Sequence, residues 1–462
     1  MYDLVVRGGT VVTTGAEGVC DVGVHDGRIA QLGGPMQGRQ EIDARGLYVL
    51  PGGVDVHVHL TSPVAPGSGV EVRPDDFYTG SLAALAGGIT TVGNMTFQRS
   101  GERLQDALDR DLAAARQDAA VDYILHPVLT DPTPVVLEEI PRLAAAGHTS
   151  LKVFMVTEQF DAQIDAYVEA IRLAGAAGML TLVHCEDGAL VRCAGRALLA
   201  ADRGAARFYP DSRPVWSESA AVERAVAIAR AVAAPLYVVH LSSAAALDAC
   251  RRARADGVPV FVETRPMYLH LTRAAFDAPD AAKVAGAPPL RDAADVRALW
   301  AGLAGGDVQC VCSDHAPWTL AQKLDPALDV TTLRQGVADL ETLRPMLFSE
   351  GVRAGRLSLS RFVDVTATAA AKLFGLYPRK GTVAVGSDAD LVLWDPARRW
   401  VVDGARMYSR AGYTPYDGRE VLGAPRLVFS RGELVAADGQ VTAARGRGRW
   451  LARAARPGGP WT

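Results

Sequence analysis

The chain has 462 residues, of which 49% are hydrophobic, and a formal net charge of −4. The charge excludes a strongly basic nucleic-acid-binding surface, and the sequence shows neither a signal peptide nor an uncharged apolar stretch long enough for a membrane span. We therefore expect a cytoplasmic protein with a small-molecule partner, folded as one large domain and a smaller one.

The two ends of the chain have the pattern of a small β domain. The first fifty residues contain short strands separated by glycine turns, such as "YDLVVRGG" and "CDVGVHDG", and strands return in "RLVFSRGELVAADGQV" near the other end. Neither end has enough strands for a stable core. We expect residues 1–52 and 377–440 to form one β-sandwich, and the basic, Gly/Pro-rich residues 441–462 to be a surface tail or subunit arm.

Residues 53–376 have the pattern of repeated βα units. Eight short apolar strands are each followed by an Ala/Leu-rich helical stretch: "VDVHVHL", "TTVGNM", "YILHPVL", "LKVFMV", "LTLVHCED", "LYVVHLSS", "VPVFVETRP" and "VQCVCSDH". Strands that alternate with helices in this way favour a parallel sheet, and eight of them predict a closed (β/α)8 TIM barrel of the α/β class.

Side chains able to bind a metal occur at the carboxyl ends of these strands. They are His57, His59, Lys152, His184, His240 and Asp314. Barrel enzymes carry their active sites at this end, and imidazole and carboxylate ligands suit zinc and its first-row neighbours. The remaining histidines show no such arrangement, although His315 follows Asp314 and is placed to support it. The six cysteines contain no CxxC pair, so we expect reduced, structural thiols.

Lys152 lies in the middle of an otherwise apolar strand, "TSLKVFMV". A buried ammonium is costly, so such a lysine extends its head to water, forms an ion pair, loses its proton or is chemically modified. Five imidazole and carboxylate ligands are more than one catalytic zinc uses, which favours two metal ions. A neutral amine that adds carbon dioxide becomes a carbamate, which could bridge two such ions together with a hydroxide.

Nearly the whole chain resembles the amidohydrolase superfamily, and within it the cyclic amidohydrolases. The resemblance is carried by "PGGVDVHVHL", "LKVFM", "LVHCEDG", "VVHLSS", "SDHAP", "LFGLYPRKGTVAVGSDADLVLWDP" and "YTPYDGREVLGAP", and the last two are most similar to hydantoinases and dihydropyrimidinases. It implies one metal on His57 and His59, another on His184 and His240, and a carboxylated Lys152 between them. It also implies a homotetramer or homodimer, with the C-terminal tail reaching a neighbour.

The resemblance further implies hydrolysis of a ring amide. A hydroxide bridging two divalent metal ions would attack the carbonyl carbon, and the ring would open to an N-carbamoyl or N-acyl amino acid. Asp314 would bind the first metal and carry the proton from the hydroxide to the departing ring nitrogen.

The expected substrate contacts depart from the family pattern. A tyrosine that donates to the oxyanion in hydantoinases is replaced by Thr157, a serine before "PPLR" by Ala287, and an asparagine by Gln335. Dihydroorotases carry an arginine and allantoinases an asparagine where this chain has Thr61. The Pro/Gly-rich "TSPVAPGSGVE" predicts a mobile loop over the pocket. Phe154 and Phe160 are candidates to shape substrate specificity or, equally, to pack in the core.

Two alternative functions remain open at this point. The altered contacts agree with a recruited enzyme that keeps the metals but opens another lactam, imide or allantoin-like ring. A non-catalytic, dihydropyrimidinase-like scaffold protein would share the fold but lack the metal ligands, and the full ligand set in this sequence argues against it.

Overall fold

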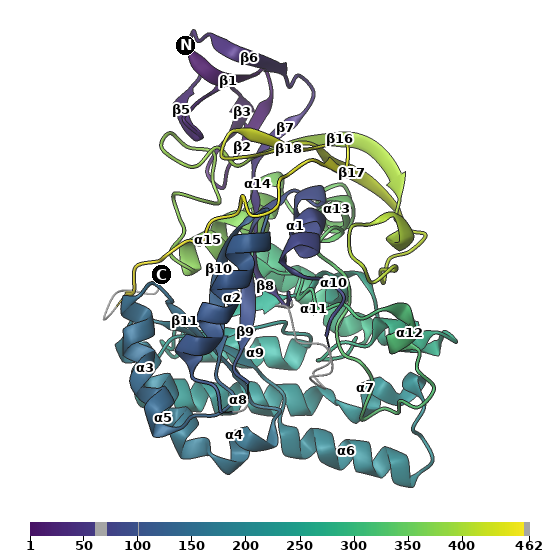
Figure 1. Ribbon diagram of the computed structural model, residues 1–462. Helices are drawn as coiled ribbons and strands as arrows, with labels where there is room; N and C mark the ends of the chain where they lie inside the picture. Colours follow the sequence, from purple (N-terminus) through teal and green to yellow (C-terminus); the bar gives the residue numbers. More distant parts are fainter. Residues whose placement is uncertain (61–71, 100, 457–462) are drawn as a thin grey trace.

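The computed structural model describes residues 1–60, 72–99 and 101–456, which form a barrel with smaller sheets at one side (Figure 1). In these residues the strands belong to sheets of four, eight and seven strands. The four-stranded and seven-stranded sheets lie together at the top of Figure 1, and the barrel with its helices lies below them. The six cysteines are free thiols.

The eight-stranded sheet is a parallel barrel in chain order. Its strands are β8 (Gly53–Val58), β9 (Ile89–Phe97), β10 (Asp122–Val128), β11 (Ser150–Phe154), β12 (Leu180–His184), β13 (Leu236–Val238), β14 (Val260–Thr264) and β15 (Cys310–Val311). The strands are almost continuously buried because helices cover the outer face and side chains fill the interior. A bridge between Val58 and His315 brings the first strand next to the segment after the last. The predicted barrel is confirmed.

Helices follow the barrel strands. They are α1 (Phe77–Ala86), α2 (Leu104–Asp118), α3 (Pro134–Ala145), α4 (Glu158–Ala162), α5 (Ile164–Ala176), α6 (Gly188–Ala200), α7 (Tyr209–Ser212), α8 (Val215–Val232), α9 (Ala244–Ala255), α10 (Pro266–His270), α11 (Ala293–Gly305), α12 (Leu320–Lys323), α13 (Leu343–Leu347), α14 (Leu359–Val363) and α15 (Ala369–Leu373). Several begin with a side-chain cap. Asp187, for example, follows the end of β12 closely and accepts a hydrogen bond from the Leu190 amide of α6.

The other two sheets combine both ends of the chain. The four-stranded sheet contains β1 (Tyr2–Arg7), β4 (Val22–His25), β5 (Arg28–Leu32) and β6 (Gly38–Asp43). The seven-stranded sheet contains β2 (Thr10–Val12), β3 (Glu17–Val19), β7 (Tyr48–Pro51), β16 (Leu391–Val401), β17 (Glu420–Ser430), β18 (Glu433–Ala437) and β19 (Gln440–Val441). Leu4 and Ile29 of the first sheet share a core with Leu391 and Phe429 of the second. The predicted sandwich from both chain ends is confirmed, while its exact residue limits stay a prediction.

The C-terminal segment is anchored to the barrel over part of its length. In Figure 1 it runs from the small sheets along the barrel toward α3. The backbones of Tyr123 and Leu451 are hydrogen bonded at 2.9 Å, and the Leu451 side chain is buried in the barrel core. Arg453 is buried as well and donates to Ser150 Oγ. Up to Arg453 the segment therefore lies against the barrel, held by its backbone pairing with β10 and by the buried Leu451 side chain. Its expected role as a surface tail or subunit arm stays a prediction.

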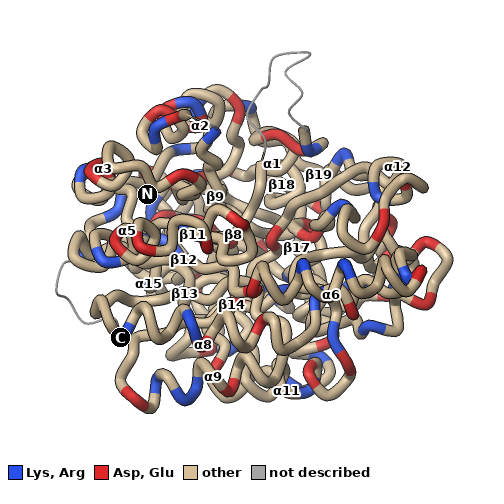
Figure 2. Tube along the Cα trace, turned by 90° about the horizontal axis from the view of Figure 1, so that it is seen from below, with Lys and Arg blue, Asp and Glu red and all other residues tan. Residues whose placement is uncertain are grey.

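The surface shows no segregation of charge in the view of Figure 2. Acidic and basic residues are interspersed over the helices seen around the barrel there. Within the described ranges, no helix combines the length and the apolar character that a membrane span needs.

Candidate metal centre

The six side chains predicted from the sequence as metal ligands all lie at the carboxyl end of the barrel. His57 is in β8 and His59 follows it, Lys152 is in β11, His184 ends β12, His240 follows β13, and Asp314 follows β15. All of them except Lys152 line a pocket of about 380 Å³. Strands distant in sequence thus deliver these groups to one place because parallel barrel strands end at the same rim.

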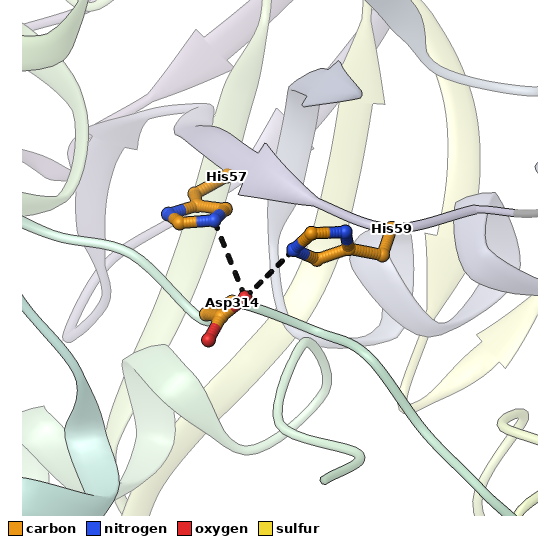
Figure 3. Close-up of side chains that lie close together, drawn as sticks. All are labelled: His57, His59 and Asp314. Atoms are coloured by element: carbon orange, nitrogen blue, oxygen red, sulfur yellow. Dashed lines mark hydrogen bonds and ion pairs between the residues drawn. The ribbon is translucent and has the colours of Figure 1, made fainter. Parts of the chain in front are cut away.

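The first group consists of His57, His59 and Asp314 (Figure 3). Asp314 Oδ1 lies 2.9 Å from His59 Nε2 and 3.3 Å from His57 Nε2. The ligand atoms of all three residues lie within 4.8 Å of one another, and all three side chains are buried. Two imidazole nitrogens and a carboxylate oxygen that converge in this way form a donor set suited to zinc and similar divalent ions.

The second group, His184 and His240, lies beside the first. His184 Nδ1 is 2.9 Å from His240 Nε2, and the ring centroids of His57 and His240 are 5.5 Å apart. The Glu186 carboxylate lies 2.8 Å from His184 Nε2 and makes that nitrogen the donor, so the lone pair is on Nδ1. Two ring nitrogens that face each other at the pocket are placed to share one ion.

Two buried carboxylates that the sequence analysis missed orient these rings. Glu263 Oε1 lies 2.7 Å from His57 Nδ1 and accepts a hydrogen bond from the His240 amide at 3.1 Å. Glu186 contacts His184 and is paired with Arg213 at 3.1 Å. Carboxylates behind histidine ligands fix the tautomer and raise the basicity of the ring. Their position near strand ends, in "LVHCED" and "FVET", is the signal that could have identified them.

Lys152 is fully buried, which excludes the alternative of a head extended to water. Its Nζ has no hydrogen-bond partner among the described residues and lies 4.7 Å from the centroid of the Phe154 ring. Burial lowers the pKa of Lys152 to about 8, although the charges of Glu263 and Asp314 oppose this effect. A substantial fraction of the amine is therefore neutral near that pH, which is the nucleophilic form.

The remaining groups have the protonation states that a metal site requires. Burial lowers the pKa of His59 to about 3 and the pKa values of His184 and His240 below the ordinary value. Burial alone would raise the pKa of Asp314, but the charge of Arg265 and the neighbouring imidazoles hold it well below its usual range. Neutral imidazoles and an ionised carboxylate are the forms that bind metals.

The buried Arg265 divides the two oxygens of Asp314 between different partners. Its Nη1 lies 3.0 Å from Asp314 Oδ2, whereas Oδ1 faces His57 and His59. The guanidinium therefore fixes the carboxylate with one oxygen turned toward the imidazoles. Arg265 also had no role in the sequence analysis, because its pairing with Asp314 depends on β14 and β15 lying side by side in the sheet.

Two of the candidate ligands have a strained backbone. His240 has φ of 37° and Asp314 has φ of 46°, in the left-handed region that residues other than glycine seldom adopt. Such conformations cost about 1–3 kcal/mol and persist where the surrounding structure enforces them, often at functional sites. Both residues follow the end of a short barrel strand, and both line the pocket.

The residues fit a divalent metal pair. His57 Nε2 and Lys152 Nζ are buried without a hydrogen-bond partner among the described residues, a state that is rare for buried polar atoms. His57 Nε2 lies next to the Asp314 carboxylate. The Lys152 amine is close enough to His184 and His240 for its charge to add to the lowering of their pKa values by burial.

The three predicted substrate contacts, Thr157, Ala287 and Gln335, all line the pocket. The Thr157 hydroxyl is already engaged, because it donates to the Phe154 carbonyl at 3.2 Å and accepts from the Phe160 amide at 3.3 Å as the N-cap of α4. The side chain of Ala287 is only a methyl group, so a polar contact there would have to come from its backbone. The backbone carbonyl of Gln335 accepts a hydrogen bond from the Trp318 indole at 2.9 Å.

The remaining residues singled out from the sequence lie in different surroundings. Phe154 lines the pocket, whereas Phe160 is buried against Tyr167 and belongs to the core. His315 supports the site as expected, because its carbonyl accepts from the His59 amide and its Nε2 contacts Asp75 at 2.9 Å. The predicted mobile loop and Thr61 fall in residues 61–71, outside the described residues.

Comparisons with known proteins agree with this geometry. The Amidohydrolase family matches residues 48–435. D-phenylhydantoinase of Escherichia coli O9:H4 is 37% identical over 97% of this chain and 98% of that enzyme. The crystal structure of a dihydropyrimidinase from Brevibacillus agri is similar with a TM-score of 0.93 and 36% identity over 98% of each chain. L-hydantoinase from Arthrobacter aurescens is similar with a TM-score of 0.89 and 32% identity, over 98% of this chain and 100% of that one.

Proposed function

Since the chain belongs to the amidohydrolase family and is a homologue of hydantoinases and dihydropyrimidinases, we propose that it is a two-metal hydrolase that opens a cyclic amide or ureide. The observation that carries this proposal is the convergence of His57, His59 and Asp314 beside His184 and His240. In the proposal the first three would hold one ion, the other two would hold the second, and a carboxylated Lys152 would contribute an anionic group to both. The donor set favours zinc.

The chain's own residues would then divide the reaction as follows. Two divalent cations, when bound, supply Lewis acidity to water and to the scissile carbonyl. Asp314 begins ionised, so it takes the proton of the attacking water and delivers it to the departing ring nitrogen. Phe97 and Phe154, stacked with centroids 5.7 Å apart, form an apolar wall against which the ring lies. The product is an N-carbamoyl or N-acyl amino acid.

Thr157 favours a second candidate within the same chemistry. Its hydroxyl caps α4, so it does not supply the oxyanion donor expected of a hydantoinase. Loss of one such donor costs about 3 kcal/mol of transition-state stabilisation. A recruited enzyme acting on another lactam, imide or allantoin-like ring would not need it. A non-catalytic scaffold protein would have no need of the buried metal ligands, so their presence argues against that alternative. A homotetramer or homodimer stays a prediction.

Metal analysis and a substrate panel test the proposal. Protein prepared with zinc and bicarbonate is assayed on dihydrouracil, hydantoins, allantoin, dihydroorotate and succinimide. We expect two metal ions per chain and hydrolysis of at least one ring. Lys152→Ala should lose metal and activity, with partial rescue by a short carboxylic acid, while the exposed Lys372→Ala keeps both. Protein that binds no metal, or a fully active Lys152→Ala variant, would contradict the proposal.

A further inference from the structure

Arg73 is a pocket residue that neither the metal centre nor the proposed mechanism uses. It lines the same cavity as His59 and Asp314 and precedes α1 by a few residues. Apart from the histidines, Arg73 and Asp314 are the charged side chains among the described residues that line this cavity. The few polar groups of a small-molecule pocket provide its specificity, and a guanidinium matches the geometry of a carboxylate or phosphate.

Arg73 is fixed in place by its surroundings. Its Nη1 donates to the Ala316 carbonyl at 2.8 Å, and its guanidinium lies over the Trp318 ring, 5.0 Å from the centroid. The Ala316 carbonyl belongs to a tightly built wall, because a Cβ on the neighbouring Gly336, with φ of +113°, would come within 2.2 Å of that oxygen. The guanidinium is therefore held against the pocket wall, and no other acceptor among the described residues occupies its remaining N–H groups.

Among the described residues, no carboxylate forms an ion pair with Arg73. Asp314 is the acidic side chain nearby, and Arg265 already pairs with that carboxylate at 3.0 Å. Burial lowers the pKa of Arg73 to about 10, so the side chain remains charged at neutral pH. The pocket thus holds a fixed cation that has no anionic partner of its own among the described residues.

The topology places Arg73 opposite the apolar wall. Ala316 follows β15, the last barrel strand, whereas Phe154 ends β11, the fourth. In a closed eight-stranded barrel the fourth and eighth strands face each other across the mouth. A ring resting on Phe154 would therefore direct a substituent on its other side toward Arg73.

We propose that Arg73 recognises a carboxylate on the substrate, so that the preferred ring is a cyclic ureide or amide with a short acidic substituent. This inference rests on the proposed function for its reaction, but not for its anion-binding part. A guanidinium binds a carboxylate through charge-assisted, paired hydrogen bonds. A pocket of about 380 Å³ has room for such a ring together with its substituent.

The test compares two rings that differ only in charge. Zinc-loaded protein is assayed on hydantoin-5-acetic acid and on hydantoin-5-acetamide, as wild type, Arg73→Met and Arg73→Lys. Wild type should prefer the acid by at least about 10-fold in kcat/KM. Arg73→Met should remove that preference and leave the rate on the amide within about threefold. Arg73→Lys should keep part of the preference. The control is Arg399→Met, because Arg399 is exposed in β16 and pairs with Glu420.

A binding measurement separates the two proposals. N-carbamoylaspartate and N-carbamoylasparagine, the ring-opened forms, are titrated by calorimetry into the same proteins. If neither ring is hydrolysed, the proposed reaction fails for hydantoins. The inference about Arg73 then stands only if wild type binds the aspartate form at least about 10-fold more tightly and Arg73→Met does not. Equal kcat/KM for acid and amide in wild type, or equal losses on both in a folded Arg73→Met protein, would overturn the inference. Circular dichroism checks that each variant is folded. If Arg73→Met does not fold, the ratio of wild-type kcat/KM values on the acid and the amide decides the question.

Discussion

Lys152 is destabilising for as long as it carries a proton. Folding moves its ammonium into a site where Nζ has no hydrogen-bond partner among the described residues, and its pKa falls from 10.5 to about 8. Below pH 8 the folded state carries the full cost of this buried charge, about 3 kcal/mol. Between pH 8 and 10.5 the unfolded chain binds more protons than the folded one, so stability rises with pH in that window.

This reasoning gives a prediction for the metal-free protein in bicarbonate-free buffer. Lys152→Met should be more stable than wild type by up to about 3 kcal/mol at pH 7, because the variant buries no charge. The difference should shrink as the pH is raised from 8 to 10.5. Urea unfolding at pH 7 and pH 10 measures it, and the exposed Lys372→Met serves as control. A Lys152→Met protein less stable than wild type at pH 7 would show that packing around the side chain outweighs the cost of its buried charge.

Glu263 provides a second prediction at the scale of single residues. Its carboxylate holds His57 with the proton on Nδ1, so that Nε2 presents its lone pair to the pocket. Glu263→Gln removes the charge and allows the amide to donate to Nδ1, which favours the wrong tautomer. We expect metal affinity to fall by about 10- to 100-fold, measured by competition with a chromogenic chelator. Glu17→Gln, on the exposed strand β3, should leave affinity unchanged. Unaltered affinity in Glu263→Gln would mean that the His57 tautomer is set by something else.

At the scale of elements, the junction of β11 and α4 joins the candidate metal centre to the wall of the pocket. β11 carries Lys152 and Phe154, and α4 begins after the cap residue Thr157, which lies three positions beyond Phe154. The cap satisfies the Phe160 amide, one of the free donors at the start of any helix. The threonine hydroxyl therefore stabilises the start of α4 through the hydrogen bonds that it makes there.

Substitutions at this position distinguish a cap from a catalytic donor. Thr157→Ala should lower the free energy of unfolding by about 1 kcal/mol, and Thr157→Ser should restore it. The activity of both variants on the best ring of the panel should stay within about 10-fold of wild type, since the hydroxyl is already engaged in the cap of α4. Thermal unfolding and kcat provide the two measurements. A fall in kcat of about 100-fold or more in Thr157→Ala alone would instead identify the hydroxyl as an oxyanion donor.

Sequence reasoning works for elements whose signal is local. The barrel strands are short apolar runs, and polar residues such as His184 stand out where a run ends. Glu263 and Arg265 follow the same rule, but their contacts are set by the arrangement of strands. Arg265 meets Asp314 because β14 and β15 are neighbours, and Glu263 meets His57 because the barrel closes onto β8. The contacts of the C-terminal segment could not be predicted for a similar reason. Its Gly/Pro-rich composition is typical of a tail, whereas the pairing of Leu451 with Tyr123 joins residues that lie far apart in the sequence.

At the scale of the whole molecule, one buried cation joins the barrel to the small sheets. Lys380 Nζ lies 2.6 Å from Asp122 at the start of β10, and 3.0 Å and 2.7 Å from Asp388 and Asp390, which precede β16. Arg431 of the segment after β17 also pairs with Asp122. Burial alone would raise the pKa of Asp122, but these two cations hold it below its ordinary value. The cluster lies at the amino end of the barrel strands, away from the metal centre.

Removing Lys380 should therefore lower the free energy of unfolding without changing metal binding. Lys380→Met leaves buried carboxylates facing one another, and we expect a loss of about 3–5 kcal/mol in the free energy of unfolding at pH 7. Without Lys380 the carboxylates take up protons more readily in the folded state, so the deficit relative to wild type should narrow as the pH falls from 7 to 5. Urea unfolding at both pH values measures the change, and Lys372→Met, exposed on α15, is the matched control. The folded variant should bind zinc as wild type does, because the cluster and the metal centre occupy opposite ends of the barrel. A variant that unfolds like wild type at pH 7, or that keeps its stability but loses zinc, would contradict this separation of the two ends.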